Sequence, residues 1–230
     1  MSVDVNVIAI DGPVAAGKTM VGRELAKRLG LRYLDTGVMY RAITWLAMKN
    51  ATPIEDEAAL GTLASHTPIR LDGWNSDRVL VDGISVGPEL REALVDHHVS
   101  LVSQVSPVRR ALVMQQRRMA SEGQIVMVGR DIGTVVLPSA DMKIYITASS
   151  EERARRRWKE FQSQGRVSDY QSVLNETRAR DELDSQRDDS PLKPAEDAWV
   201  LDTDRLTGDE VVDLIFQRVK GSSKGGEACA

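Results

Sequence analysis

The sequence predicts an α/β fold built around a parallel sheet. Apolar runs of strand length alternate along the chain with segments whose apolar residues recur every three or four positions, which is the order of strand–helix–strand units. A glycine-rich loop at 12–19 joins the first strand-like run to the first helix-like segment. Three short strand-like runs between residues 68 and 86 interrupt this alternation, and they predict a small β-rich insertion on the core.

The elements of the N-terminal half follow from local patterns. Residues 5–10 are apolar except for Asn6 and mostly β-branched, which predicts a buried strand. Apolar residues recurring every four positions predict a helix from about Gly17, and Gly30 is a typical C-terminal stop. Asp82-Gly83 between two short apolar runs is a strong hairpin signal. The further elements predicted in this half are a strand at 32–34, a helix at 39–49, and insertion strands at 68–71, 78–81 and 84–86.

The C-terminal half continues the alternation. Ser106 is expected to cap a helix that begins with Pro107 and runs to about Met119. Ser149 and Glu152 have the spacing of a capping box at the start of an arginine-rich helix. The other predicted elements are strands at 125–128, 143–146 and 199–201, and a helix at 209–219. We expect one domain over 1–220, with an insertion at about 63–104 and a disordered tail at 221–230.

Composition limits the classes of protein. The chain has 230 residues, of which 42% are hydrophobic and 28% charged, a balance that excludes a largely disordered or fibrous protein. The formal net charge of −4 gives no basic field, so we expect no nucleic-acid partner. No run approaches the ~18 apolar residues of a membrane span, and the single cysteine, Cys229, excludes an internal disulfide. A monomer in the cytoplasm is expected.

The loop at 12–19 matches the pattern G-x-x-x-x-G-K-[ST] between a strand and a helix. Its glycines let backbone N–H groups surround phosphate oxygens, and the helix N-terminus adds a positive dipole end. Lys18 would reach the β- and γ-phosphates, and the Thr19 hydroxyl would bind Mg²⁺. The pattern predicts binding of a nucleoside triphosphate with Mg²⁺ and says nothing about the acceptor. The residues expected to bind ATP are Gly12, Pro13, Val14, Ala15, Ala16, Gly17, Lys18, Thr19 and Met20.

Three further groups of charged residues indicate a second anionic ligand. Asp35 ends the second strand, at the sheet edge where ligands bind in open parallel sheets, and Arg41 follows a glycine turn. Gly129 and Gly133 bracket an Arg–Asp pair after another strand. The third group has the spacing of one helical face and consists of Arg180, Asp184 and Arg187. Phosphate contacts are the favoured interpretation and solvated ion pairs the alternative; for the four arginines within 153–157 both interpretations stay open.

The phosphate loop and the sequence motifs that carry these charged residues resemble those of the bacterial cytidylate kinases. The resemblance extends from about residue 7 to 205. The most specific motifs are Leu34-Asp35-Thr36-Gly37 with Tyr40-Arg41, and the run from Gly129 to Val136. The resemblance implies a P-loop NTPase core with a five-stranded parallel sheet, a monophosphate-binding insertion and an arginine-rich mobile lid at about 153–187. It also implies transfer of the ATP γ-phosphate to CMP or dCMP in pyrimidine nucleotide metabolism.

The resemblance also implies roles for individual residues. Thr36, Tyr40 and Arg41 would meet the CMP end; Ser103, Arg109 and Asp131 would face the cytosine; Arg130 and Arg187 would hold the acceptor phosphate; and Arg180 and Asp184 would contact the ribose side. The catalytic set would be Lys18, Asp35, Arg130 and Arg187. Two positions depart from the family pattern: Val128 stands where an acidic residue is usual, and Met20 where a hydroxyl is usual.

Two alternatives remain open from the sequence. The first is another small-molecule kinase on the same core, with UMP, AMP or shikimate as acceptor. The second belongs to a different class: a nucleotide-dependent switch or binding module that hydrolyses or merely binds the triphosphate. The arginines after the phosphate loop favour a kinase with a second anionic substrate.

Overall fold

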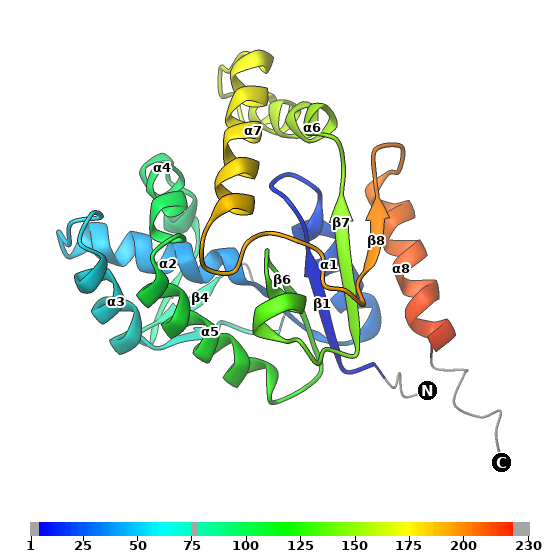
Figure 1. The fold of residues 1–230 in the computed structure, drawn as a ribbon, viewed down its shortest axis with the longest axis horizontal. Coiled ribbons are helices and arrows are strands. Elements are labelled where there is room, and N and C mark those ends of the chain that lie inside the picture. The colour runs from blue at the N-terminus through cyan, green and yellow to red at the C-terminus, as the bar shows by residue number, and fades with distance from the viewer. Residues whose placement is uncertain (1–4, 75–77, 223–230) are drawn as a thin grey trace.

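A central parallel sheet organises the computed structural model, which describes residues 5–74 and 78–222 (Figure 1). Its five strands lie in the order β2-β6-β1-β7-β8, and all neighbouring strands are parallel. The α/β class and the parallel sheet predicted from the alternating pattern are confirmed. The strands are β1 (Val7–Asp11), β2 (Arg32–Asp35), β6 (Ile125–Val128), β7 (Met142–Thr147) and β8 (Trp199–Asp202).

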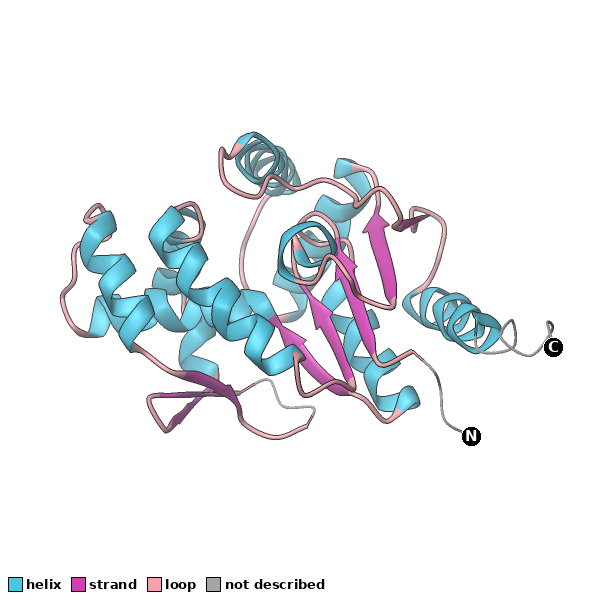
Figure 2. Ribbon diagram, turned by 60° about the horizontal axis from the view of Figure 1, so that its bottom comes forward, coloured by secondary structure: helices cyan, strands magenta, loops and turns pink. Residues whose placement is uncertain are grey.

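Strands β1 and β6, in the middle of the sheet, are apolar because helices cover both faces of the sheet. Side chains alternate between the faces along a strand, so Ile8 and Ile10 pack on one side and Ala9 on the other. On the first face lie α1 (Lys18–Leu29) and α8 (Gly208–Ser222). On the second lie α2 (Thr36–Lys49) and α5 (Ser106–Ala120). Figure 2 shows the strands between these two layers.

The insertion contains the predicted strands and two helices that the sequence analysis did not assign. Strands β3 (Ile69–Leu71), β4 (Val79–Val81) and β5 (Ile84–Val86) form a separate antiparallel sheet, seen apart from the main sheet in Figure 2. Before it comes α3 (Glu57–His66), and after it a short 3₁₀ segment (Pro88–Arg91) and α4 (Ala93–Val102). The missed signal for α3 was Asp56, whose side chain caps it by accepting from the Ala59 N–H at 2.9 Å.

Helix ends differ from the predictions at three places. Ser106 is the first residue of α5 rather than its cap, and its hydroxyl donates to Asp189 Oδ2 at 2.9 Å. Helix α2 begins three residues earlier than predicted, because the Asp35 carboxylate caps it by accepting from the Gly37 N–H at 2.9 Å. Helix α8 continues to Ser222. The rest of the predicted tail, 223–230 with Cys229, lies outside the described residues.

The arginine-rich segment forms two helices beyond the carboxyl ends of the strands, α6 (Ser150–Ser163) and α7 (Tyr170–Gln186) (Figure 1). Ser149 caps α6 as predicted, since its Oγ accepts from the Glu152 N–H at 3.2 Å. The capping box is not closed, because the Ser149 N–H donates to Asp204 Oδ1 at 2.7 Å and the Glu152 carboxylate pairs with arginines of α6. These helices share a small apolar cluster of their own, formed by Ala154, Phe161, Val173 and Leu174. The segment therefore packs partly on itself and is joined to the core mainly by polar contacts.

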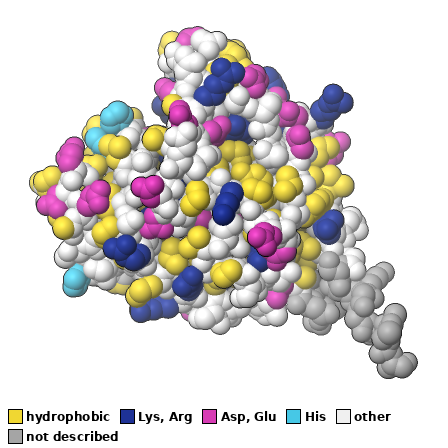
Figure 3. Space-filling model, viewed as in Figure 1, with side chains coloured by type: hydrophobic (Ala, Val, Ile, Leu, Met, Phe, Trp, Pro, Cys, Tyr) yellow, Lys and Arg dark blue, Asp and Glu magenta, His cyan; other side chains and the backbone are white. Residues whose placement is uncertain are grey.

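The surface carries charges of both signs. Figure 3 shows acidic and basic side chains interspersed over the face seen in Figure 1. Among residues 5–74 and 78–222, no helix is long and apolar enough to cross a membrane.

Candidate active site

The loop between β1 and α1 has a backbone shape that depends on its glycines. Gly12 has a φ of +148°, and a Cβ added there would lie 2.0 Å from the Ile146 carbonyl oxygen. Gly17 and Ala15 also have positive φ values, +91° and +58°. At the loop's end the Lys18 ammonium folds back and donates to the Pro13 carbonyl oxygen at 2.6 Å. The predicted phosphate loop is therefore a tight backbone cradle with a lysine at its rim.

Lys18 lies in a buried and electrostatically unfavourable position. Its side chain is almost fully covered, and burial together with the nearby Arg130 holds the pKa of the ammonium well below its usual range. Asp35 and Asp11 act in the opposite direction and favour the charged form. An anionic phosphate in the loop would supply the counter-charge that the protein only partly provides, so the site is suited to bind one.

Thr19 and Asp35 meet directly next to the loop. The Thr19 hydroxyl donates to Asp35 Oδ2 at 2.9 Å, while Asp35 Oδ1 caps α2. Among the residues that the structure describes, no cluster of three or more His, Cys, Asp or Glu could hold a metal ion. A hydroxyl and one carboxylate nevertheless fit Mg²⁺, which usually takes few protein oxygens and completes its shell with water and substrate phosphate.

Asp11 is a site residue to which the sequence analysis gave no role. Its carboxylate accepts from two successive backbone N–H groups, Ile132 at 2.8 Å and Gly133 at 2.7 Å. Burial raises the pKa of Asp11 to about 6, although these two hydrogen bonds work against the shift. Asp11 thus ties the end of β1 to the turn that carries Arg130 and Asp131. The available signal was its position directly after a buried parallel strand, at the ligand-binding edge of the sheet.

The predicted acceptor-side arginines come together around Asp184. Arg130 Nε lies 2.9 Å from Asp184 Oδ2, and Arg180 Nε lies 3.3 Å from Oδ1. Burial alone would raise the pKa of Asp184, but Arg130 and Arg180 outweigh it and lower the pKa below its usual value. The Asp184 side chain is only 5% exposed, so these are not solvated surface pairs. Two guanidinium groups sharing one carboxylate leave positive charge for a further anion.

Arg187 joins this group differently from the prediction. It is the C-cap of α7 with an extended backbone, so it does not continue the helical face of Arg180 and Asp184. Its Nη2 instead lies 3.9 Å from Asp131 Oδ1, and its Nε donates to the Ser190 carbonyl oxygen at 2.5 Å. The residue still reaches the turn after β6, by way of the loop that follows α7.

The residues expected to face the base lie next to one another. Arg109 donates to the Ser103 carbonyl oxygen at 3.1 Å and forms a buried ion pair with Asp131. Its guanidinium carbon lies 5.5 Å from the centre of the Tyr40 ring, and burial raises the pKa of Tyr40 to about 12. The Ser103 hydroxyl donates to Ser100 O at 2.9 Å, so its carbonyl rather than its hydroxyl contacts Arg109.

Thr36 and Arg41 are both engaged with protein groups. The Thr36 hydroxyl donates to the Val128 carbonyl oxygen at 3.0 Å, which fixes the start of α2 to β6. Arg41 pairs with Asp96 of α4 and donates to Leu90 O at 3.1 Å. Its charge is one of the factors that lower the pKa of Arg180, after burial and Arg130. Arg41 therefore lies between the insertion and the arginine group, which consists of Arg130, Arg180 and Arg187 with Asp184.

The four arginines within 153–157 also contact protein groups here. Arg155 and Arg156 pair with Glu152, and Arg157 lies over the Phe161 ring at 5.1 Å. Arg153 is buried and pairs with Asp181 of α7. The segment is therefore more than a solvated helix face.

The two departures from the family pattern have local explanations. Val128 is 1% exposed and packs against α1, where a Cβ at Gly22 would come within 2.4 Å of it. Met20 extends toward the start of α8, since its Cε would lie 2.0 Å from a Cβ at Gly208. Met20 thus reaches the start of α8, and Thr19 supplies the hydroxyl that donates to Asp35.

The chain is similar to known proteins in both sequence and fold. The family model described as cytidylate kinase matches residues 8–221. The cytidylate kinase of Caldanaerobacter subterraneus is 47% identical over 95% of this chain and 96% of its own length. That of Desulforamulus reducens is 47% identical over 93% of this chain and 96% of its own. A gluconokinase from Sinorhizobium meliloti shares the fold, with a TM-score of 0.50 at 13% identity over 95% of this chain and 94% of its own. The chain belongs to the cytidylate kinase family.

Proposed function

We propose that this protein transfers the γ-phosphate of ATP to CMP or dCMP, giving ADP and CDP or dCDP. The observation that carries the proposal is the meeting of two cationic groups at one edge of the sheet. Lys18 follows β1 and Arg130 follows β6, and these two strands are parallel neighbours in the sheet. The charge of Arg130 helps to lower the pKa of Lys18, while Asp184 acts in the opposite direction. One group suits the donor phosphates and the other an acceptor phosphate. Relatives named cytidylate kinases, 47% identical, support cytosine as the acceptor base.

On the donor side, residues 12–20 would hold ATP, with Lys18 on the β- and γ-phosphates. Thr19 and Asp35 would hold Mg²⁺, directly or through water. When bound, Mg²⁺ would neutralise charge on the phosphates. The Lys18 ammonium would stabilise the charge that develops between the β- and γ-phosphates as the bond between them breaks.

On the acceptor side, an oxygen of the CMP phosphate would attack the γ-phosphorus, and the bond to the β–γ bridging oxygen would break to release ADP. This acceptor oxygen is already an anion, so the step needs no general base. Arg130 and Arg187 would hold the phosphate, and Arg180 with Asp184 would contact the ribose side. Their work is alignment and charge neutralisation, and closure of α6 and α7 would exclude water from the transfer.

The base would be read by Asp131, with Arg109 and Ser103 beside it. A carboxylate accepts from the 4-amino group of cytosine and repels the 4-carbonyl of uracil. Asp131 Oδ2 is engaged by Arg109, whereas Oδ1 has Arg187 at the longer distance of 3.9 Å. Oδ1 is therefore the better-placed oxygen for the base. Monomeric state and cytoplasmic location stay predictions.

A coupled ADP-release assay tests the function. The purified protein with ATP and Mg²⁺ is assayed alone and with CMP, dCMP, UMP, AMP or shikimate. We expect CMP and dCMP to raise the rate of ADP release by orders of magnitude, and the other acceptors to do so far less. Preference for another acceptor would assign a different kinase. ADP release that no acceptor changes would assign a nucleotide-dependent switch or binding module.

A further inference from the structure

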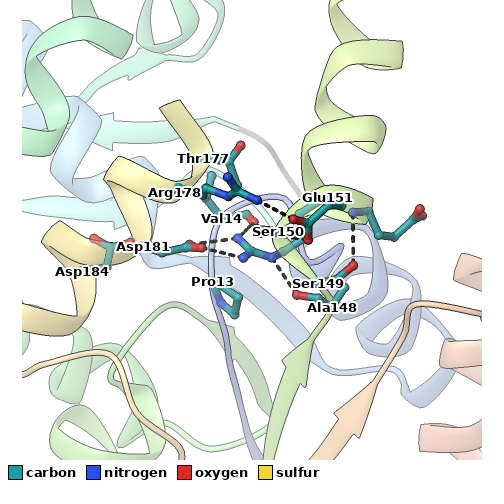
Figure 4. A network of polar contacts seen from close by, with 12 residues as sticks. Pro13, Val14, Ala148, Ser149, Ser150, Glu151, Thr177, Arg178, Asp181 and Asp184 are labelled. Atoms are coloured by element: carbon teal, nitrogen blue, oxygen red, sulfur yellow. Dashed lines mark hydrogen bonds and ion pairs between the residues drawn. The ribbon is translucent and has the colours of Figure 1, made fainter. Parts of the chain in front are cut away.

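Arg153 joins the phosphate loop to the lid through a buried guanidinium. Its Nε donates to the Ala148 carbonyl oxygen at 2.9 Å, and Nη1 donates to the Val14 carbonyl oxygen at 3.1 Å. Nη1 and Nη2 also form a two-pronged ion pair with Asp181, at 2.9 and 2.5 Å. The side chain is 5% exposed. Figure 4 shows Val14, Ala148 and Asp181, the three residues that this guanidinium connects.

We propose that Arg153 is a positioning residue. It holds the phosphate loop in the conformation that binds phosphate and fixes the position of the loop relative to helix α7. The proposal rests on the proposed function, since it assigns donor binding to the loop and acceptor binding to α7. Arg153 would act through Val14 at one end and Asp181 at the other, without touching the reacting atoms.

The effect on the loop follows from peptide geometry. In a trans peptide the carbonyl oxygen and the next N–H point in opposite directions. By fixing the Val14 carbonyl toward itself, Arg153 directs the Ala15 N–H away from the guanidinium. Ala15 has a φ of +58°, a conformation that a residue with a Cβ adopts at a cost and keeps only when its surroundings hold it. The contact to Val14 is one such restraint, placed one residue away.

The effect on the acceptor side follows from the position of Asp181. It lies on α7, directly after Arg180 and one turn before Asp184. Asp181 links α7 to the phosphate loop through Arg153, and Asp184 links α7 to the turn after β6 through Arg130. Two charged contacts one helical turn apart thus attach the same helix to the donor loop and to the acceptor turn. Loss of the Asp181 contact would let α7 move relative to the phosphate loop, and loss of the Asp184 contact would let it move relative to the turn after β6.

The chain offers a matched control in a second ion pair between the same helices. Arg178 of α7 pairs with Glu151 of α6 at 2.5 Å, also seen in Figure 4. Both side chains are more than half exposed, at 54% and 56%, so the pair should contribute little to the stability of the protein. Within the described part of the chain, the ion pair of Arg178 is with Glu151 and not with the phosphate loop. Arg178→Met therefore removes an equal charge and an α6–α7 pair without the link to Val14.

The test compares Arg153→Met, Asp181→Asn, the double variant, Arg153→Lys and Arg178→Met. The measured quantities are KM for ATP, KM for CMP, kcat, and the affinity of a non-hydrolysable ATP analogue with and without CMP. We expect Arg153→Met to raise KM for ATP and the analogue Kd about tenfold or more, and Arg178→Met to change them less than about twofold. CMP should strengthen analogue binding less in Arg153→Met than in the wild type.

Two further comparisons separate positioning from general stability. Asp181→Asn should raise KM for ATP in the wild-type background and have little further effect in Arg153→Met, because both changes break one link. Lysine at position 153 keeps the positive charge, so Arg153→Lys should be closer to the wild type in thermal stability than Arg153→Met. Its ammonium cannot donate to two carbonyl oxygens and to both oxygens of a carboxylate at once, so KM for ATP should stay raised.

The proposal is overturned if Arg153→Met, like the control Arg178→Met, matches the wild type both in its affinity for the ATP analogue and in the effect of CMP on that affinity. Should Arg153→Met fail to fold, Asp181→Asn decides alone, since its amide has the shape of the carboxylate it replaces, and wild-type behaviour there also overturns the proposal. If the wild type does not phosphorylate CMP, the proposed function fails. The role of Arg153 in the loop is then still judged from analogue binding, which needs no acceptor.

Discussion

Arg109 and Asp131 form a buried ion pair in which Arg109 Nη2 donates to Asp131 Oδ2, with side-chain exposures of 2% and 6%. The pair connects α5 to the turn after β6. Asp131 does not pair with its neighbour Arg130, whose partner is Asp184. Asp131 is therefore held by one arginine in a fixed orientation, while its Oδ1 faces Arg187 at a longer distance of 3.9 Å.

This arrangement predicts a base-reading role for Asp131. Replacing Asp131 with Asn or Ala should lower kcat/KM for CMP much more than for UMP, because a carboxylate accepts from the cytosine amino group and the variants remove that acceptor or its charge. The ratio of the two kcat/KM values should fall by roughly 5- to 150-fold, the cost of an unpaired buried polar group.

Both variants remove the negative charge that faces the buried Arg109. Asn is the sharper variant, since its amide oxygen can still accept from Arg109, whereas Ala leaves the guanidinium without this acceptor and costs about 3–5 kcal/mol of stability. Steady-state kinetics with both substrates on wild type and variants decides the matter. Equal losses with CMP and UMP would mean that Asp131 only orients Arg109.

Lys18→Ala should abolish phosphate transfer and leave the fold intact. The ammonium lies at the rim of the phosphate loop, and charge-stabilising groups of this kind contribute about 10²-fold or more to kcat. Burial and Arg130 already lower the pKa of Lys18, so its removal should not destabilise the ligand-free protein strongly. Rates and circular dichroism check the two halves of the prediction, and a kcat above about a tenth of wild type would contradict it.

Arg130→Met and Arg187→Met should act on the acceptor side. Each should depress kcat/KM for CMP by about 10²-fold or more, with a smaller effect on KM for ATP, because a bidentate grip on the acceptor phosphate is lost. Lysine at either position should rescue only in part, since it lacks the planar fork of arginine. A wild-type response to CMP would return these residues to a purely structural role.

Asp11 should give folding stability a defined pH dependence. Its pKa is raised from 3.8 in the unfolded chain to about 6 in the folded one. Between these values the folded state binds the extra proton, so this group's contribution to the free energy of unfolding decreases as pH rises, by up to about 1.4 kcal/mol per pH unit. Above about pH 6 the contribution should be constant.

Urea unfolding of the wild type and of Asp11→Asn from pH 4 to 8 isolates the effect. The stability difference between wild type and variant should fall with rising pH up to about 6 and then level off, because the variant lacks the titrating group. A difference that stays constant with pH, or grows on approach to pH 6, would contradict the raised pKa.

The sequence by itself determined the central sheet, the phosphate loop and several helix ends, because each depends on neighbours within a few residues. Apolar runs set the strands, and Gly30 ends α1 in the left-handed conformation as predicted. Capping by Ser149 likewise needs only residues three positions apart. The helices α3 and α4 were missed because each has only 10 residues and so few apolar repeats, although the capping residue of α3 was visible.

The tertiary structure alone decided how the charged residues pair. Arg109 meets Asp131, Asp11 meets the N–H groups of Ile132 and Gly133, and Arg153 meets Val14. These partners lie between 22 and 139 positions apart in the chain. Spacing along a strand or helix fixes which face a side chain takes, but not which other element arrives opposite that face. An arginine has five donors that several carboxylates and carbonyls could satisfy, so its partners are selected only when the sheet and its covering helices have packed.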